Sequence, residues 1–445
     1  MGVLRRLHLA THAASVMMLV SRLEVRWRLC LWVAGIAVAA RAIMVAVSAP
    51  PGGLEAVDES VAAANLLAGR GFVFEQYGTV YRAFKEPLYI VLVAGLLKWF
   101  GASTPALVAF QTSFGVAAAL LMIWVSQGIF GDRRRAALAG TLTALNPFLI
   151  YYDTQIIYPL SLHACLFLAT TGTIIVAVRQ GGPTMSRVCW AAVVMGLTLW
   201  QRGIYLAAGI GSWLGALIWA QPTRRRWIIQ AMICWLAVAV TIISPWLIRN
   251  YRLLDRVVLT TESAHLIWAD NTTVPNAIVL RDGRRRIAME DATFQRRLDD
   301  ASELEQYDLF RHAAWASIMQ DPARFVGLAL ARVKIFFWFS PTPGEIYTPL
   351  QRMLYRIAYL LLLGFGGLGL ALHLRTAGAE RTAAIILLSA VAVLAAAHAL
   401  FLMNLKYRLP WELVLCLFAP ESLLRLPVVI RTGRQWLAMP SPRSS

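Results

Sequence analysis

The stretch PALVAFQTSFGVAAALLMIWVSQGIFGDRRR, residues 105–135, combines the two signals that decide the fold class. Its first part, residues 105–130, has no charged residue and exceeds the roughly 20 residues with which a helix crosses a bilayer. It ends in the triplet Arg133 to Arg135, and basic clusters beside a span mark the cytoplasmic side of a membrane. The stretch therefore predicts a transmembrane helix that ends inside the cell.

The whole chain has a composition that fits this interpretation. Of its 445 residues, 58% are hydrophobic and 15% charged, and the mean hydropathy is +0.60. A water-soluble fold cannot hide that much apolar surface, so we expect an all-α polytopic membrane protein. In a soluble protein the net charge of +18 would suggest nucleic acid. Here it reflects basic cytoplasmic loops, and we expect no nucleic-acid partner.

Further apolar segments suit helical spans. They cover residues 29–49, 86–100, 105–130, 136–152, 155–177, 188–201, 203–220, 227–246, 323–340, 353–372, 383–403 and 411–429. Arginine clusters at 133–135, 179–187 and 224–226 should all be cytoplasmic. Residues 1–28 contain several arginines and a weakly apolar stretch, so we expect a cytoplasmic or interfacial N-terminus.

The side of the membrane on which each basic cluster lies decides how many of the first segments can cross it. If the N-terminus and the arginine triplet both lie inside, only one of 86–100 and 105–130 crosses between the first span and the triplet. Segment 86–100 is shorter, begins at Pro87 and carries Lys98. We therefore expect it to lie on the outer face, within a first outer loop at 50–104. Residues 29–246 then form a seven-span module.

The chain after this module begins with a region of different composition. Residues 247–322 hold twelve of the 24 acidic residues, which predicts a soluble domain on the outer side. Segment 323–340 carries three basic residues, which favours an interfacial helix over a span. Three more spans in 341–430 then place the tail 431–445 inside. The result is about ten spans; an eleven-span alternative puts the tail outside, against the positive-inside rule.

The first outer loop carries a pair of carboxylates and a pair of cations. Asp58 and Glu59 follow the first span, and a carboxylate at a membrane surface can act as a general base or bind a divalent cation. The alternative is an N-cap on the helical stretch that follows. Arg82 and Lys85 lie further along the loop and suit a lipid phosphate. Alternatively, Arg82 and Lys85 only extend their charged ends to the membrane interface, which is known as snorkelling.

Other segments bring polar groups to the same outer face. They are Asp153 in NPFLIYYDTQIIYP, Arg202 and Tyr205 in LWQRGIYL, Arg249 in SPWLIRNY, and Lys406 and Arg408 in NLKYRLPWE. Arg202 and Arg249 are candidates for an anion, and Tyr205, Lys406 and Arg408 for other parts of a substrate. Asp153 lies alone among aromatic residues, and its alternative is a solvated loop acid.

Carboxylates and cations at one membrane face suit a transfer from a lipid-linked phosphate to a hydroxyl or amine. A base removes the proton of the acceptor while cations, or a metal ion, stabilise the departing phosphate. The sequence contains neither GxxxxGK[ST] nor GxGxxG, so it does not support ATP or a nucleotide sugar as the energy source. An activated lipid needs neither on the outer side.

These residues resemble those of the GT-C-type integral-membrane glycosyltransferases. Within them the chain is similar to the bacterial branch related to protein O-mannosyltransferases and to the transferase that adds aminoarabinose to lipid A. The similar stretches run from residue 57 to about 412. They are VDESVAAANLLAGRGF, KEPLYIVLVAGLLKWFG, LTALNPFLIYYD, WQRGIYL, SPWLIRNYRLLDR and KYRLPWE.

The resemblance implies a seven-span catalytic module, a polyprenyl-phosphate-sugar donor and a periplasmic active site in a bacterial inner membrane. It implies that Asp58 is the catalytic base with Glu59 beside it, and that Lys85 contacts the donor phosphate. A divalent cation (Mg, Mn, Ca or Zn) is implied for many members of this group, and Asp58 and Asp153 are its candidate ligands here. Relatives often have another acidic residue near Tyr158, and this chain does not.

We therefore expect an inverting hexosyl- or pentosyltransferase whose acceptor is a glycolipid, polysaccharide or protein. One alternative is a lipid or sugar transporter or flippase, which the intramembrane Arg41 favours. Against it, the polar groups gather at one face instead of the midplane, and no inverted repeat is seen. Another alternative is a non-catalytic assembly protein that uses residues 247–322 as a docking domain.

Overall fold

A computed structural model describes residues 27–48, 54–55, 58–76, 79–179, 184–272, 276–281, 284–289, 291–339, 348–401 and 403–437. Its N-terminal helix is Trp27–Ser48. The other helices of the first half are α2 (Asp58–Leu67), α3 (Pro87–Phe100), α4 (Thr104–Phe130), α5 (Arg133–Ala144), α6 (Pro147–Gln155), α7 (Leu160–Arg179), α8 (Met185–Leu199), α9 (Tyr205–Trp219) and α10 (Pro222–Leu254).

The second half contains α11 (Glu262–Asn271), α12 (Ala292–Asp299), α13 (Glu303–Gln320), α14 (Pro322–Phe337), α15 (Pro349–Arg375), α16 (Ala379–Ala399), the 3-10 helix η1 (Leu405–Arg408) and α17 (Leu409–Leu437). Two antiparallel hairpins complete the described chain. They are β1 (Phe74–Gln76) with β2 (Thr79–Tyr81), and β3 (Asn276–Arg281) with β4 (Arg284–Met289).

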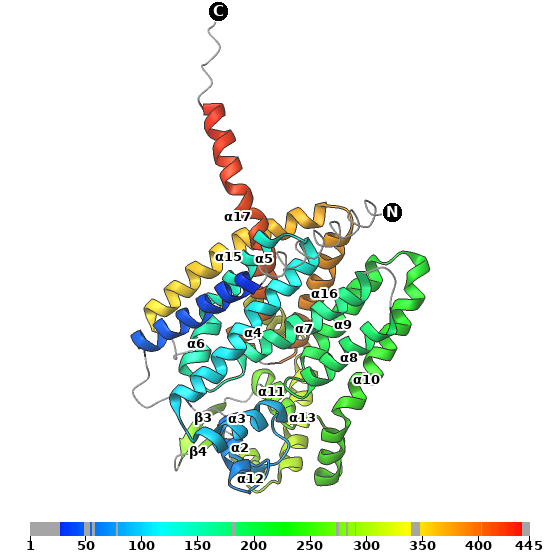
Figure 1. Ribbon diagram of the computed structural model, residues 1–445. Helices are drawn as coiled ribbons and strands as arrows, with labels where there is room; N and C mark the ends of the chain where they lie inside the picture. Colours follow the sequence, from blue (N-terminus) through cyan, green and yellow to red (C-terminus); the bar gives the residue numbers. More distant parts are fainter. Residues whose placement is uncertain are drawn as a thin grey trace, which may run out of the picture.

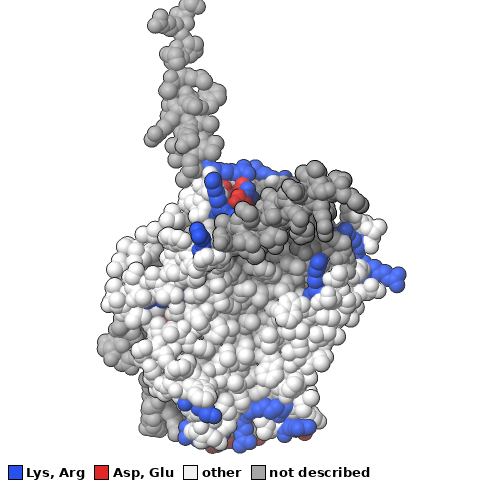
Figure 2. Space-filling view, viewed as in Figure 1, with Lys and Arg blue, Asp and Glu red and all other residues white. Residues whose placement is uncertain are grey.

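The long helices lie side by side in a bundle, and the short elements gather at one end of it (Figure 1). On the face shown in Figure 2, the lysines and arginines lie toward the two ends of the molecule, with a broad band of uncharged residues between them. Among the described residues, six helices are long and apolar enough to cross a membrane. An apolar belt of this kind needs lipid around it. The prediction of an all-α polytopic membrane protein is therefore confirmed.

The number of spans stays a prediction. The six candidate spans are the N-terminal helix, α4, α7, α10, α15 and α16. The predicted ten also require the shorter apolar helices α8 and α9, the α5–α6 pair and α17. Most of segment 323–340 belongs to α14, which ends at Phe337 and is not one of the six, and α3 packs against α2. Residues 1–26 and 438–445, which cover most of the predicted cytoplasmic ends, lie outside the described residues.

The segment 136–152 was expected to form one helix, and the structure breaks it into α5 and α6. The break lies at Asn146-Pro147, where the proline ring has no N–H to donate to the preceding turn. Asn146 caps the new helix: its side chain accepts hydrogen bonds from the amides of Phe148, at 3.0 Å, and Leu149, at 3.2 Å. The pair Asn146-Pro147 thus changes the direction of the chain, and α6 runs toward the loops.

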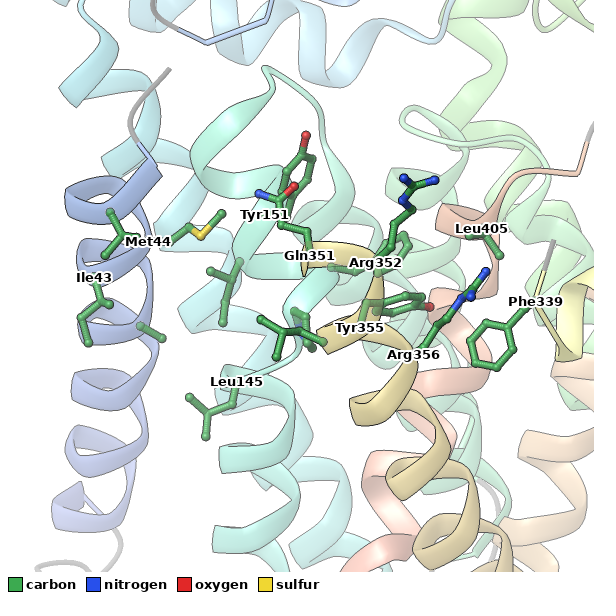
Figure 3. A pocket seen from close by; sticks show the side chains of 16 residues that line it. Ile43, Met44, Leu145, Tyr151, Phe339, Gln351, Arg352, Tyr355, Arg356 and Leu405 are labelled. Atoms are coloured by element: carbon green, nitrogen blue, oxygen red, sulfur yellow. The ribbon is translucent and has the colours of Figure 1, made fainter. Parts of the chain in front are cut away.

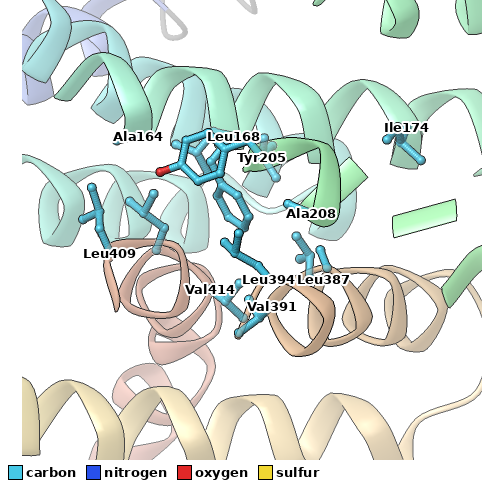
Figure 4. Close-up of a cluster of buried hydrophobic side chains, with 14 of the residues drawn as sticks. Ala164, Leu168, Ile174, Tyr205, Ala208, Leu387, Val391, Leu394, Leu409 and Val414 are labelled. Atoms are coloured by element: carbon cyan, nitrogen blue, oxygen red, sulfur yellow. The ribbon is translucent and has the colours of Figure 1, made fainter. Parts of the chain in front are cut away.

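Glycines allow close contact between helices of the bundle. Gly211 and Gly215 of α9 face α16, and a Cβ on Gly215 would lie 2.9 Å from the Cα of Ile386. On α15, a Cβ on Gly369 would lie 2.8 Å from the carbonyl carbon of Phe418 in α17. Without a strong hydrophobic force between helices in lipid, such close backbone packing is a main source of association. Figure 4 shows the resulting core, where Ala208 of α9 faces Leu387 and Leu394 of α16.

The described parts of residues 54–103 and 255–320, which we name the loop layer, share one hydrophobic core. Phe74 and Tyr81 of the first hairpin pack in the same cluster as Trp268 of α11 and Phe310 of α13. The sequence suggested an outer loop and a separate insertion, but the two segments form one structural unit. The insertion also begins later than residue 247, because α10 continues until Asp255 adopts a left-handed conformation with φ 50°.

Candidate functional site

Lys85 lies between two carboxylates at the junction of the loop layer and the bundle. Its Nζ is 3.6 Å from an Oδ atom of Asp58 and forms a closer ion pair with Glu262. Asp58 begins α2, Lys85 precedes α3, and Glu262 begins α11, so three separate segments supply the group. The side chain of Asp58 is 21% exposed, so a molecule from outside can reach it.

Glu303 of α13 accepts hydrogen bonds from both chain segments that meet at this group. Its carboxylate accepts hydrogen bonds from the amides of Arg82, at 2.6 Å, and Ala83, at 3.0 Å. It also accepts one from the hydroxyl of Thr261, at 2.7 Å. The first loop and the insertion are therefore joined next to Lys85 and Glu262. Hydrogen bonds to a carboxylate are stronger than those between neutral groups, so Glu303 connects the two segments firmly.

A cavity of about 380 Å³ opens beside the Lys85–Glu262 pair. Its lining includes Glu86, Arg202, Glu262 and Ser263, and its size falls in the range of roughly 300–1,000 Å³ typical of small-molecule sites. Glu86 accepts a hydrogen bond from the backbone amide of Gly203, at 2.8 Å, which fixes the α8–α9 turn that carries Arg202. One cavity thus combines a guanidinium with two carboxylates.

Contacts with two tyrosines place Lys406 near this site. Its ammonium is 4.0 Å from the ring centre of Tyr158 and 5.5 Å from that of Tyr407. The guanidinium of Arg202 lies 5.2 Å from the ring of the same Tyr407. Cation–π contacts hold a cation while leaving its hydrogen-bond donors free. Lys85, Arg202 and Lys406 therefore bring three positive charges to one end of the bundle.

The charge of Lys85 and those of Glu262, Glu59 and Asp58 stabilise one another. Burial by itself would lower the pKa of Lys85, but Glu262, Glu59 and Asp58 more than offset it and raise that pKa well above its ordinary value. Burial favours a raised pKa for Glu262, yet the charges of Lys85 and Arg202 lower it overall. Both groups are therefore ionised across the physiological pH range. His265, one turn after Glu262, stays neutral because burial lowers its pKa to about 4.

The pKa values of Glu59 and Glu86 are shifted in the direction opposite to that of Glu262. Burial raises the pKa of Glu59, and Lys85 only partly offsets this effect. Burial likewise raises the pKa of Glu86, against the opposing charge of Arg202. Glu59 is 6% exposed, whereas the side chain of its neighbour Asp58 is 21% exposed. Of the acidic pair in the first loop, Asp58 is thus the residue that a molecule from outside could reach.

Asp153 is not a solvated loop acid, and that interpretation is wrong. It lies in α6 with 0% exposure, 2.7 Å from the Nε of Arg41 in the N-terminal helix. Ser161 donates a second hydrogen bond to the same carboxylate, at 2.8 Å. Gly115 of α4 makes room for the pair, since a Cβ there would lie 2.6 Å from the carboxylate. Arg41 therefore has a structural partner inside the bundle.

Arg408 and Tyr205 were predicted to bind substrate, and the structure buries both. Arg408 is 0% exposed; it ion-pairs with Glu412 at 3.2 Å, contacts the hydroxyl of Tyr355, and donates to the carbonyl of Trp338 at 2.7 Å. Tyr205 is 6% exposed and packs in the core shown in Figure 4. Neither lines the cavity described above.

Arg82 and Arg249, predicted as phosphate ligands, form part of the support around the site. Arg249 donates to the carbonyl of Arg82 at 2.7 Å, and its guanidinium lies 4.5 Å from the ring centre of Trp246. The side chain of Arg82 is exposed. These contacts hold the first loop against α10. The structure brings Lys85 and Arg202 to the cavity region, but it uses Arg249 to position the loop.

The described residues do not suit a divalent cation. A cation site needs several oxygen or nitrogen ligands converging on one point. Among the residues that the structure describes, no three His, Cys, Asp or Glu residues converge in this way. The candidate ligands also face positive charges: Asp58 faces Lys85, and Asp153 faces Arg41. The ammonium of Lys85 occupies the place between carboxylates where a metal ion would bind.

Sequence reasoning missed Glu262 and gave no role to Glu86. Glu262 was counted only as one of the acidic residues of the insertion. Its partner Lys85 is 177 positions earlier in the chain, so no local pattern links them. A signal was available for Glu86, which directly follows Lys85 and precedes Pro87 at the start of an apolar helix. Such a position favours a carboxylate fixed near a helix N-terminus.

Comparison with known proteins supports the fold class. By sequence, the chain matches no protein-family model and none of the curated proteins. By structure, it is similar to ArnT from Cupriavidus metallidurans bound to undecaprenyl phosphate, with 13% identity over 93% of this chain and 81% of that one and a TM-score of 0.43. It is also similar to the Archaeoglobus fulgidus oligosaccharyltransferase in complex with zinc and sulfate.

The second similarity carries the assignment of the fold. The TM-score is 0.52 at 13% identity, covering 92% of this chain and 50% of the oligosaccharyltransferase. This chain thus spans about half the length of that protein. Both similar proteins are GT-C glycosyltransferases. The chain therefore has a GT-C-type membrane fold, and the predicted resemblance is confirmed at the level of the fold.

Proposed function

We propose that this protein is an inverting glycosyltransferase that moves a sugar from a polyprenyl phosphate to a hydroxyl or amine acceptor. The observation that carries the proposal is the position of Asp58: a reachable carboxylate beside the ammonium of Lys85, next to a cavity that contains Arg202. An acid–base group and two cations are what the transfer of a sugar from a phosphate requires.

In the proposed reaction, the carboxylate of Asp58 removes the proton of the acceptor. The acceptor oxygen or nitrogen attacks the anomeric carbon from the side opposite the phosphate, and a new glycosidic bond forms. The bond between the anomeric carbon and the phosphate oxygen breaks, and its electron pair remains on the phosphate. Lys85 and Arg202 stabilise this developing negative charge. No step requires a metal ion.

Glu262 controls the availability of Lys85 in this proposal. The ammonium already pairs with Glu262, so a donor phosphate competes with that carboxylate for the same charge. Arg202 faces the cavity from the α8–α9 turn and supplies the second cation. Lys406, held over Tyr158, is suited to bind a polar group of the sugar or the acceptor.

We propose a lipid-linked donor that binds on the periplasmic side. The similar ArnT structure contains undecaprenyl phosphate, and both similar proteins are glycosyltransferases. We propose a bacterial inner-membrane protein with a cytoplasmic N-terminus and the loop layer in the periplasm. The arginine triplet at the start of α5 lies at the end of α4, opposite the loop layer in Figure 1, as this orientation requires.

The flippase alternative loses its main support. It rested on Arg41 as an intramembrane charge available to a substrate. Arg41 is 1% exposed and forms an ion pair with Asp153. Its NH1 also donates to the carbonyl oxygens of Ala37, at 3.0 Å, and Ala144, at 3.1 Å. A charge held in this way contributes to packing, so transfer at the loop layer remains the function that the geometry supports best.

The test is a transfer assay with purified protein, labelled polyprenyl-phosphate sugar and membrane extract. Removing a general base typically costs about 10²–10⁴-fold in rate. We therefore expect Asp58→Asn to lower kcat by at least about 100-fold with little change in the KM for the donor. The matched control is Asp299→Asn, an exposed loop-layer acid at the end of α12.

Transfer by Asp58→Asn at the wild-type rate would show that the base assignment is wrong. Labelled lipid that changes sides in vesicles, without any labelled product, would support the flippase alternative.

A further inference from the structure

A second hollow lies on the bundle, between the N-terminal helix, α6 and α15. Its volume is about 350 Å³, and its walls are mostly apolar. Its lining includes Ile43 and Met44 of the N-terminal helix, Phe148 of α6 and Leu354 of α15. It has no residue in common with the cavity that contains Arg202. We name it the lateral groove.

The lateral groove opens toward the surrounding bilayer. The N-terminal helix buries only 17% of its apolar window inside the protein, and α15 buries 28%. On the edges of the groove, Ile43 is 64% exposed, Val47 78% and Leu354 54%. Side chains of this kind at the surface of a membrane-spanning helix face lipid chains. An occupant of the groove therefore enters from the membrane.

The polar side chains of the groove gather at one end. Figure 3 shows Tyr151, Gln351 and Arg352 toward the end of the bundle that carries the loop layer, while Leu145 lies at the other end. A lipid has the same division, with a polar headgroup at one end and an apolar chain at the other. The groove thus matches a single lipid chain with its headgroup at the loop-layer end.

Two arginines give this polar end a positive charge. Arg352 and Arg356 line the groove from the first two turns of α15, and a spacing of four puts them on one face of the helix. Arg356 also lies 5.5 Å from the ring centre of Phe339. The next 16 residues, 357–372, contain no charged side chain, so the two arginines mark one membrane interface.

We propose that the lateral groove binds a phospholipid of the bilayer with a net negative headgroup. Its acyl chain fills the space between Met44 and Leu354, and its phosphate contacts Arg352 and Arg356. The charge at one end and the apolar walls at the other carry this assignment. The lipid is distinct from the donor, because the groove and the Arg202 cavity share no residue, and the inference does not depend on the proposed reaction.

The experiment measures lipid binding to the full-length purified protein by native mass spectrometry. We expect one bound phosphatidylglycerol that phosphatidylcholine displaces poorly. Each basic residue near an anionic lipid surface contributes about 1 kcal/mol, so Arg352→Gln with Arg356→Gln should weaken phosphatidylglycerol binding about 30-fold. The control is Arg252→Gln, which removes an exposed arginine at the same end of the bundle, on α10.

A second variant tests the apolar part of the groove. Ala40 lines the groove from the N-terminal helix, so Ala40→Trp should fill it and abolish the bound lipid while both arginines remain. Val38→Trp, on the exposed side of the same helix, is its control. Unchanged phosphatidylglycerol binding in the double arginine variant would overturn the proposal. So would equal displacement by undecaprenyl phosphate, because the groove would then hold the donor chain.

Discussion

Among the described residues, two groups of charges can be compared, one at the loop layer and one inside the bundle. In the bundle, Arg41 pairs with Asp153 and Arg408 with Glu412, and all four side chains are at most 3% exposed. At the loop layer, Lys85 and Glu262 are 11% and 14% exposed, and Asp58 is 21% exposed. Both groups pair a basic side chain with Asp or Glu, and the sequence assigned members of both to one site.

The difference shows how exposure separates structural from functional charge. A charge fully removed from water persists only when its partners compensate the lost hydration, so its geometry cannot change without a large cost. A charge at the edge of a cavity keeps part of its hydration and can exchange one partner for another. In the proposed reaction, the loop-layer group therefore accepts a substrate phosphate, whereas the bundle pairs keep helices together.

The largest effect is expected from breaking the bundle pair. Arg41→Leu leaves the carboxylate of Asp153 buried without its cation, which typically costs about 3–5 kcal/mol of stability. We expect a large drop in the thermal unfolding temperature in detergent, while the KM for the donor in the surviving folded protein is unchanged. The double variant Arg41→Leu with Asp153→Leu should recover much of the loss, because the uncompensated charge is gone.

A rise in donor KM in Arg41→Leu, without loss of stability, would place Arg41 at the substrate and contradict this comparison.

The next effect is expected at the centre of the loop-layer group. Lys85→Met removes a charge-assisted contact to the donor phosphate worth about 1.5–3 kcal/mol. That loss corresponds to a decrease of about 10- to 150-fold in kcat/KM, with a smaller loss of stability than in Arg41→Leu. Steady-state transfer kinetics and thermal unfolding measure the two quantities. Lys98→Met, an exposed lysine on α3, should leave both unchanged.

A smaller effect of the opposite sign is expected for Glu262→Gln. The carboxylate competes with the donor phosphate for Lys85, and a partly exposed ion pair contributes about 0.2–1 kcal/mol. The variant should therefore lower the KM for the donor by about 1.4- to 5-fold. Titration of the donor at constant acceptor concentration measures this change. An increased KM would mean that Glu262 orients Lys85 for binding and does not compete with the phosphate.

The smallest effect is a change in pH dependence. The pKa of Glu59 is raised in the folded protein above its ordinary value of about 4.3, mainly by burial. Its ionisation therefore disfavours the folded state, and stability falls as the pH rises from the ordinary pKa through the raised one. Glu59→Gln should make the unfolding temperature less dependent on pH in the range above the ordinary pKa of a glutamate. A slope identical to that of wild type would contradict the raised pKa.

The Lys85–Glu262 pair affects the pH dependence of stability in the opposite way to Glu59. The lowered pKa of Glu262 means that its stabilisation is present above the ordinary pKa and is lost only as the pH falls through the lower folded value. The raised pKa of Lys85 means that its stabilisation is lost only at strongly alkaline pH. Between these limits the pair stays charged.

Several features of the site could be predicted from the sequence because they are local. Asp58 follows an apolar span and begins a helical stretch, and Lys85 precedes Pro87 and another apolar segment. Both positions lie at the edge of a membrane by hydropathy alone. Arg202 interrupts an apolar stretch between two short segments, which marks it as a costly and hence informative charge.

Other residues could not be assigned in this way because their partners are distant in the chain. Asp153 pairs with Arg41, 112 positions earlier, and hydropathy gives no sign of it. Arg408 looks like an outer-edge cation in NLKYRLPWE, but the folding of α15 against α17 encloses it with Tyr355 and Glu412. The same local pattern is thus compatible with a ligand or with a buried structural pair.

Hydropathy and charge bias are properties of the sequence by itself. They determined that this protein is a polytopic helical membrane protein, and they placed Asp58 and Lys85 at the edge of apolar segments. They do so because the bilayer acts on each segment separately. Only the tertiary structure decided which charges meet. Glu262 reaches Lys85 through the shared core of the loop layer, and Asp153 reaches Arg41 through the space left by Gly115. Such pairs depend on the packing of distant segments, which no local pattern encodes.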